Sequence, residues 1–81
     1  MTSEVEVRVP KLSMDAVQAT FVAWLVDDGA TVEDEQPLYT VETDKVETDV
    51  LAPASGVLRR GSAVPGTEYP IGTVLGVIEA G

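Results

Sequence analysis

Short runs of alternating hydrophobic and polar residues, separated by turn-forming residues, extend along the whole chain. Val5–Val9 alternates in this way and ends at Pro10, which has no backbone N–H to donate to a ladder, so a first strand is predicted there. Leu38–Glu42 and Val46–Leu51 are rich in Val, Thr and Tyr, and only three residues separate them. This pattern predicts a β-hairpin with Lys45 at or beside its tip. Turn signals recur along the rest of the chain at the spacing of an all-β domain of many short strands.

One segment fits two periodicities. Between Met14 and Leu25, apolar residues follow the i, i+3, i+7 spacing of a helix, but the same stretch also alternates and is β-branched and aromatic at its centre. An internal repeat favours the strand, because residues from Phe21 to Glu42 resemble those from Leu58 to Glu79, each 37 positions later. The second copy holds too many Gly and Pro residues to be helical. We therefore expect two similar halves that close around one core.

Length and composition limit the class of protein. The 81 residues, 44% of them hydrophobic, suffice for a single domain spanning residues 1–81. A net charge of -9 argues against nucleic acid or a membrane surface as partner. No apolar stretch reaches the roughly 20 residues of a spanning helix, and the acidic start is unlike a secretory leader, so a soluble intracellular protein is expected. Without Cys or His the chain lacks most nucleophilic and acid–base chemistry, which argues against an enzyme.

Lys45 is the one residue whose surroundings suggest chemistry. Four carboxylates lie within four positions of it in the sequence: Glu42, Asp44, Glu47 and Asp49. Opposite charges favour the protonated amine, so Lys45 is not expected to act as a catalytic base. It could be an ordinary surface lysine balanced by acidic neighbours, or an acceptor for covalent acylation by an enzyme that recognises this acidic surface. Composition alone leaves both readings open.

Three separated motifs resemble one family. The segment Glu42–Val46, with Val9–Ser13 before it and Ala52–Leu58 after it, is similar to the lipoyl domain of the 2-oxo acid dehydrogenase multienzyme complexes. The resemblance covers Val9–Ile78. It implies a flattened barrel or sandwich of two four-stranded antiparallel sheets with pseudo-two-fold symmetry, and a modified lysine at the tip of one hairpin.

The resemblance also implies roles for the residues around that tip. Lys45 would be the attachment site of lipoic acid, joined as an amide that removes the positive charge of the side chain. Glu42 resembles the acidic residue that the attaching ligase reads, Asp44 helps to set the turn, and Val46 completes the motif for ligase or partner recognition. For Glu42 and Asp44 the ordinary alternatives are a solvated charge and a turn carboxylate.

Further positions match the family outside the hairpin. Gly29 and Gly56 match glycines that let the chain pass close beside the hairpin, and we group them with the recognition residues. A requirement for positive φ explains these two glycines equally well. Trp24 also matches, and we assign it to packing with Phe21 and Leu25.

The chain departs from the family pattern at three positions. Ala19, Glu35 and Gly61 stand where glycine, glycine and a large apolar residue are more usual. The first two are expected to alter turn geometry, and Gly61 is expected to weaken the core locally.

The implied function is that of a non-catalytic carrier, part of an acyltransferase subunit. Lipoate on Lys45 would be a swinging arm that carries acyl groups and electrons between the active sites of a 2-oxo acid dehydrogenase complex. The implied partners are the lipoate-attaching ligase or transferase, a thiamine-diphosphate 2-oxo acid dehydrogenase, the acyltransferase catalytic domain and dihydrolipoamide dehydrogenase. The cofactor would supply the dithiol that a chain without cysteine lacks, and the negative charge would steer the domain toward basic rims around partner active sites.

Two other functions stay open at this stage. A biotin carrier domain shares the barrel, but its lysine usually lies between two methionines, whereas here the neighbours are Asp44 and Val46. An unmodified barrel could serve as a structural adaptor, as in membrane-fusion subunits of efflux pumps, but those usually contain a long helical insertion that 81 residues cannot hold. Bacterial cytoplasm and mitochondrial matrix suit a lipoyl domain equally.

Overall fold

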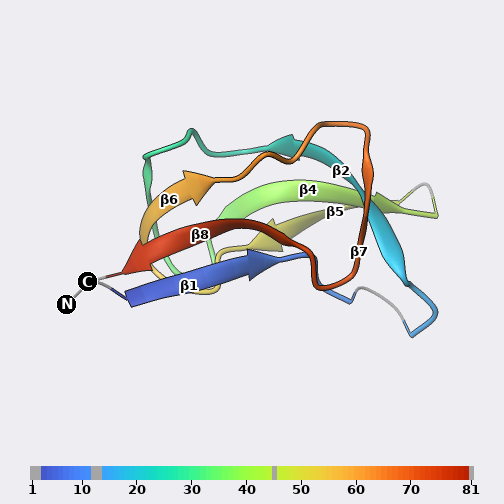
Figure 1. Cartoon of the computed structure of the whole chain (residues 1–81), viewed down its shortest axis with the longest axis horizontal. Coiled ribbons are helices and arrows are strands. Elements are labelled where there is room, and N and C mark those ends of the chain that lie inside the picture. Colours follow the sequence, from blue (N-terminus) through green and yellow to red (C-terminus); the bar gives the residue numbers. More distant parts are fainter. Residues whose placement is uncertain (1–2, 12–13, 45, 81) are drawn as a thin grey trace.

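The computed structural model describes residues 3–11, 14–44 and 46–80, which form eight β-strands (Figure 1). The strands are β1 (Ser3–Arg8), β2 (Gln18–Trp24), β3 (Thr31–Val32), β4 (Pro37–Thr43), β5 (Val46–Leu51), β6 (Gly56–Arg60), β7 (Glu68–Pro70) and β8 (Val74–Ala80). The segment with two periodicities therefore forms a strand from Gln18 to Trp24 and no helix. Within the described ranges no helix could cross a membrane.

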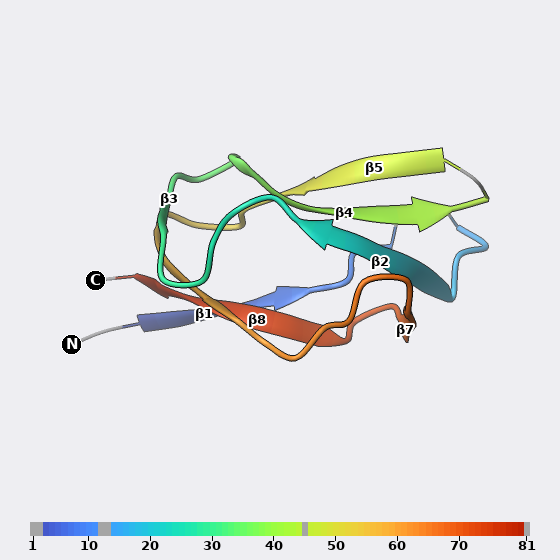
Figure 2. The ribbon, with the colours of Figure 1, turned by 90° about the horizontal axis from the view of Figure 1, so that it is seen from above.

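The strands form two four-stranded sheets in which every pair is antiparallel. One sheet has the order β1-β8-β6-β3 and the other β5-β4-β2-β7. The two sheets pack face to face in a flattened sandwich, as Figure 2 shows from above. The architecture expected from the sequence is thus confirmed. Ser3 pairs with Ala80, so both ends of the described chain lie together, at the opposite end of the molecule from the β4–β5 hairpin.

The internal repeat corresponds to a pseudo-two-fold relation between the sheets. Exchanging β1–β4 for β5–β8 converts the order of one sheet into that of the other. β4 and β8 start 37 positions apart, at Pro37 and Val74, and have the same pattern of burial. The two halves differ in the loop that follows their first strand, which is longer after β1 than after β5. That longer loop lies beside the hairpin that contains Lys45.

The core lies between the sheets and consists of apolar side chains from both. Its buried members are Val7, Val9, Ala19, Phe21, Val32, Leu38, Tyr39, Val41, Ala52, Leu58, Leu75 and Ile78. Leu38 and Tyr39 are adjacent yet both buried, because the β4–β5 register shifts between Pro37 and Tyr39. The Tyr39 hydroxyl donates a 3.0 Å hydrogen bond to the carbonyl oxygen of Arg8, which links the two sheets. Burial raises the pKa of this phenol.

Trp24 packs as expected against Phe21, with ring centroids 5.4 Å apart in an edge-on arrangement. It also packs edge-on against Tyr39, and the Arg60 guanidinium lies 5.5 Å from the centroid of its ring. Leu25, the other expected partner, is 49% exposed. The indole therefore covers one end of the core under a cationic side chain.

The three departures from the family pattern have distinct structural outcomes. Ala19 is buried inside β2 and so does not alter a turn. Glu35 occupies a turn at φ 70°, where a glycine would be less strained. The expectation for Gly61 is wrong: a Cβ there would lie 2.5 Å from the carbonyl oxygen of Leu75. Gly61 permits close approach of two backbones, so it does not mark a missing core side chain.

Candidate functional site

The β4–β5 hairpin forms the tip of the candidate site. Its last cross-strand pair is Thr43 with Val46, so the connection consists of Asp44 and Lys45. Asp44 has φ 49°, in the left-handed region that aspartate tolerates and that two-residue hairpin turns require. Lys45, the residue expected to carry a cofactor, lies outside the described residues. The paired strands on either side confirm the predicted hairpin.

The described residues on either side of Lys45 in the sequence face the solvent. Asp44 is exposed, and Val46 is 60% exposed although it is β-branched and apolar. Glu42 lies directly opposite Glu47 across the hairpin. The ion pairs found among the described residues, Arg8–Glu6 and Arg59–Glu79, are both in the other sheet. The Thr40 hydroxyl donates a 3.0 Å hydrogen bond to Asp49. Like charges placed directly opposite each other weaken strand pairing, so folding stability does not explain this acidic tip.

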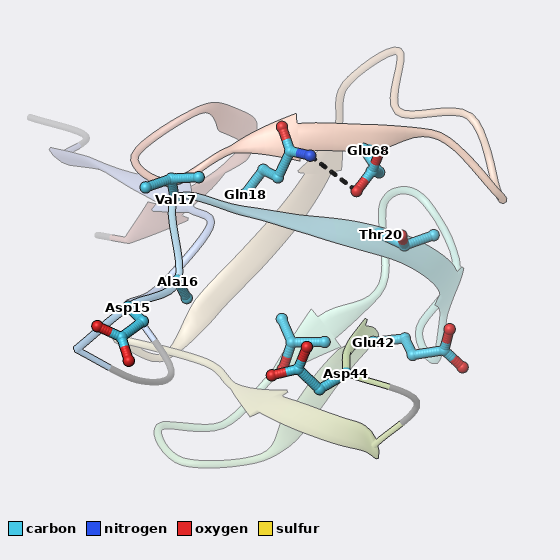
Figure 3. A pocket seen from close by; sticks show the side chains of 9 residues that line it. Asp15, Ala16, Val17, Gln18, Thr20, Glu42, Asp44 and Glu68 are labelled. Atoms are coloured by element: carbon cyan, nitrogen blue, oxygen red, sulfur yellow. Dashed lines mark hydrogen bonds between the residues drawn. The ribbon is translucent and has the colours of Figure 1, made fainter.

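A groove of about 370 Å³ runs beside the hairpin. One wall comes from the β1–β2 loop, residues 15–17, and the other from Glu42–Asp44 at the end of β4, as Figure 3 shows. β2 and β7 form the floor, where the Gln18 side-chain amide donates a 2.9 Å hydrogen bond to Glu68 (Figure 3). Carboxylates from three segments, the β1–β2 loop, the β4–β5 hairpin and β7, line the groove: Asp15, Glu42, Asp44 and Glu68.

The β1–β2 loop adds apolar surface to the same end of the molecule. Met14 is 91% exposed and Val17 is 75% exposed, so neither contributes to the core. Sequence reasoning missed this groove. The one signal for it in the sequence was the helical spacing of Met14 and Val17. These two apolar residues are not part of a helix in the described structure, and both lie on the surface.

Gly29 and Gly56 do not let the chain pass close beside the hairpin, and that expectation is wrong. Gly56 pairs with Val32, and a Cβ on it would lie 2.3 Å from the carbonyl oxygen of Glu79, near the end of β8. Gly29, at φ 84°, precedes β3, and β3 lies at the end of the molecule away from the hairpin tip (Figure 2). Each glycine has a local structural reason, and a recognition role for them stays a prediction.

The described residues offer carboxylates, hydroxyls and amides at this site. Within residues 3–11, 14–44 and 46–80, no group of three or more acidic, His or Cys side chains could hold a metal ion. The arrangement instead presents a short turn, with acidic residues in it and beside it, on a support of two paired strands. Such a support suits the display of a covalently attached group to other proteins.

The fold and the hairpin define a carrier domain of the biotin and lipoyl attachment class. The family model described as "Biotin-requiring enzyme" matches residues 5–78, and the chain belongs to this family. The solved lipoyl domain of the 2-oxoglutarate dehydrogenase complex from Azotobacter vinelandii is similar at a TM-score of 0.74 and 28% identity, covering 95% of this chain and 99% of that one. A single-chain long-chain acyl-CoA carboxylase matches 96% of this chain and 7% of its own at a TM-score of 0.78 and 22% identity, which shows the fold alone.

Curated relatives carry the same domain within larger proteins. The dihydrolipoyllysine-residue acetyltransferase component of the acetoin cleaving system from Cupriavidus necator is 40% identical over 70 residues, covering 86% of this chain and 19% of the relative. The succinyltransferase component of the 2-oxoglutarate dehydrogenase complex from Bartonella vinsonii is 37% identical over 76 residues, covering 94% and 18%. The chain thus spans about a fifth of the length of these relatives. The attachment domain is a non-catalytic carrier of a cofactor.

Proposed function

We propose that residues 1–81 form a single lipoyl carrier domain, with lipoate joined through an amide to the side-chain nitrogen of Lys45. The observation that carries this proposal is the register of the hairpin. Thr43 pairs with Val46, which leaves Lys45 and Asp44 as the connection, in a family whose members attach a cofactor covalently. The exposure of Asp44 and Val46 suits an arm that must enter the active sites of other proteins.

Lipoate is favoured over biotin by two observations. The neighbours of Lys45 are Asp44 and Val46, and neither methionine of the chain lies beside it. The curated relatives named above are dihydrolipoyllysine acyltransferase components, whereas the carboxylase is similar in fold alone. A biotin carrier is therefore the second candidate.

The residues of this chain would hold and orient the arm and mark its attachment site for the ligase. Asp44 sets the turn, and the ladder from Thr43–Val46 back to Tyr39–Val50 keeps the tip rigid. Glu42, Asp44 and Val46 form the surface that the attaching ligase reads. When bound, the cofactor supplies a dithiolane that accepts acyl groups and electrons.

The partners would be those of a 2-oxo acid dehydrogenase or acetoin-cleaving complex. They are the thiamine-diphosphate dehydrogenase, the acyltransferase catalytic domain and dihydrolipoamide dehydrogenase. Tethering the arm to one small domain raises its effective concentration at each active site. The net charge of -9 favours association with basic surfaces around those sites.

Intact mass spectrometry of the protein from a host with working lipoylation tests this function. We expect one lipoyl increment, located on Lys45 by peptide fragmentation. Lys45→Arg keeps the charge but cannot form the amide, so it should stay unmodified while folding normally. A biotin increment would select the second candidate. An unmodified wild-type chain, with a known lipoyl domain modified in the same cells, would contradict the proposal.

A further inference from the structure

The loop that forms one wall of the groove is held at both ends by a single distant turn. This turn, Pro70–Thr73, joins β7 to β8. At the start of the loop, the Val9 amide donates to the Thr73 carbonyl at 3.0 Å, and the Gly72 amide donates to the Val9 carbonyl at 2.9 Å. At the end of the loop, the Ile71 amide donates to the Val17 carbonyl at 3.0 Å.

A side chain adds a fourth link, and internal bonds stiffen the turn. The Arg8 guanidinium donates a 2.9 Å hydrogen bond from Nη1 to the Gly72 carbonyl. The amide and hydroxyl of Thr73 both donate to the Pro70 carbonyl, at 3.1 and 2.7 Å. Gly72 has φ 91°, a conformation that a residue with a Cβ rarely adopts. The turn is therefore a defined structure that is bonded to both ends of the loop.

The pseudo-two-fold relation supplies an internal comparison. The equivalent turn, Glu33–Gln36, makes the same pair of backbone bonds to Ala52, at 2.9 and 2.8 Å. There the third bond runs from the Asp34 amide to the Ser55 side chain, at 3.0 Å. Both halves thus fix the loop after their first strand in the same way. Only in the first half does that loop border the hairpin with Lys45.

We propose that the Pro70–Thr73 turn is a positioning element for the groove, with Gly72 and Arg8 as its critical residues. This inference rests on the proposed function. A partner that receives an arm from Lys45 must approach the tip of the hairpin, and it then covers the adjacent groove. The bonds to Val9 and Val17 set where the 15–17 wall stands relative to Glu42–Asp44. Gly72 and Arg8 therefore control partner affinity without lining the groove.

Two variants with matched controls test this role in the lipoylated domain. Gly72→Ala strains the turn, and Gly66→Ala is its control, because Gly66 has a similar φ of 88° and equally open space but bonds to Phe21 instead of the loop. Arg8→Met removes the donor to Gly72, and Arg59→Met removes the same charge from β6 of the same sheet, where Arg59 pairs with Glu79. Thermal unfolding verifies that all four variants are folded.

The main readout is steady-state acylation of the lipoylated domain by its thiamine-diphosphate partner. We expect KM to rise about three- to ten-fold in Gly72→Ala and Arg8→Met with kcat unchanged, because the reacting arm is untouched. The two controls should keep the wild-type KM. Amide hydrogen exchange at Ile71 should be faster in Gly72→Ala, and NMR shifts should change at Thr20, Glu42 and Asp44.

The outcomes separate this inference from the proposed function. If mass spectrometry finds no lipoyl group on wild-type protein, the proposed function fails. If the variants are lipoylated and folded but their KM values equal those of the controls, the positioning role is wrong. Unchanged exchange at Ile71 and unchanged shifts in Gly72→Ala would also overturn it, independently of any partner.

Discussion

Glu42 lies directly across the β4–β5 hairpin from Glu47, in the last pair but one of the ladder that leads to Lys45. The pseudo-two-fold relation places a second such pair, Glu79 opposite Glu4, at the other end of the molecule. There Arg59 forms a 2.8 Å ion pair with Glu79. Among the described residues, Glu42 and Glu47 have no such ion pair.

Glu47→Gln should therefore stabilise the domain, by about 0.3 kcal/mol at low salt, because it removes a like-charge pair in direct opposition. The gain should shrink as salt screens the repulsion. Thermal unfolding at low and high ionic strength measures both effects. Glu4→Gln is the matched control and should gain less, because Arg59 already neutralises its partner. Equal gains in the two variants would contradict this explanation.

Glu35→Gly should also stabilise the fold. Glu35 is exposed and has φ 70°, which costs a residue with a Cβ about 1 kcal/mol. Glycine removes that strain but adds freedom to the unfolded chain, so we expect a net gain of about 0.5 kcal/mol in chemical denaturation. Glu35→Gln removes the charge and keeps the Cβ. An equal gain in that control would assign the effect to charge and not to backbone strain.

Gly61→Ala should destabilise the domain by about 2 kcal/mol or more, because its Cβ would lie 2.5 Å from the Leu75 carbonyl. The backbones of β8 and of the segment after β6 would have to separate, which would strain the Gly61 amide bond to that carbonyl. Gly29→Ala is the control: it has the strain of φ 84° but open space around the Cβ, so it should cost about 1 kcal/mol. A smaller loss in Gly61→Ala than in Gly29→Ala, measured by urea denaturation, would refute this account.

Tyr39→Phe should cost about 1 kcal/mol at neutral pH, because it leaves the Arg8 carbonyl without its 3.0 Å donor. Burial raises the pKa of Tyr39 in the folded state above its ordinary value of about 10. The stability linked to this group is complete below about pH 10 and is lost as the pH rises further, because the unfolded phenol ionises first.

The alkaline loss from Tyr39 should approach about 1.4 kcal/mol per pH unit. Urea denaturation between pH 9 and about pH 11 measures it. This alkaline loss of stability should be reduced in Tyr39→Phe and retained in the control, Tyr69→Phe. The control removes a different hydroxyl, which accepts a hydrogen bond from the Val64 amide. Identical pH profiles for the two variants would exclude Tyr39 as the source.

Much of the fold could be predicted from local patterns. Alternation and Pro10 indicated the first strand, and the two Val- and Thr-rich runs indicated the hairpin around Lys45. These predictions succeeded because strand pairing across a short turn involves neighbours in the sequence. The repeat of Phe21–Glu42 resolved the segment that periodicity left ambiguous, because a similar sequence rich in glycine and proline excluded a helix.

The amino-acid sequence by itself determined the class of the domain, its strands and the turn at which a cofactor is proposed to attach. Tertiary structure decided what surrounds that turn. The groove joins the loop at Asp15 to Glu42 and Glu68, and its wall depends on bonds from Val9 and Val17 to a turn more than 50 positions later. The same closure of the sheets placed β3, which follows Gly29 and pairs with Gly56, at the end away from the hairpin tip, and it made Gly61 necessary. Patterns along the chain report which face of a strand is buried, but contacts between the sheets exist only once both sheets have closed on one core.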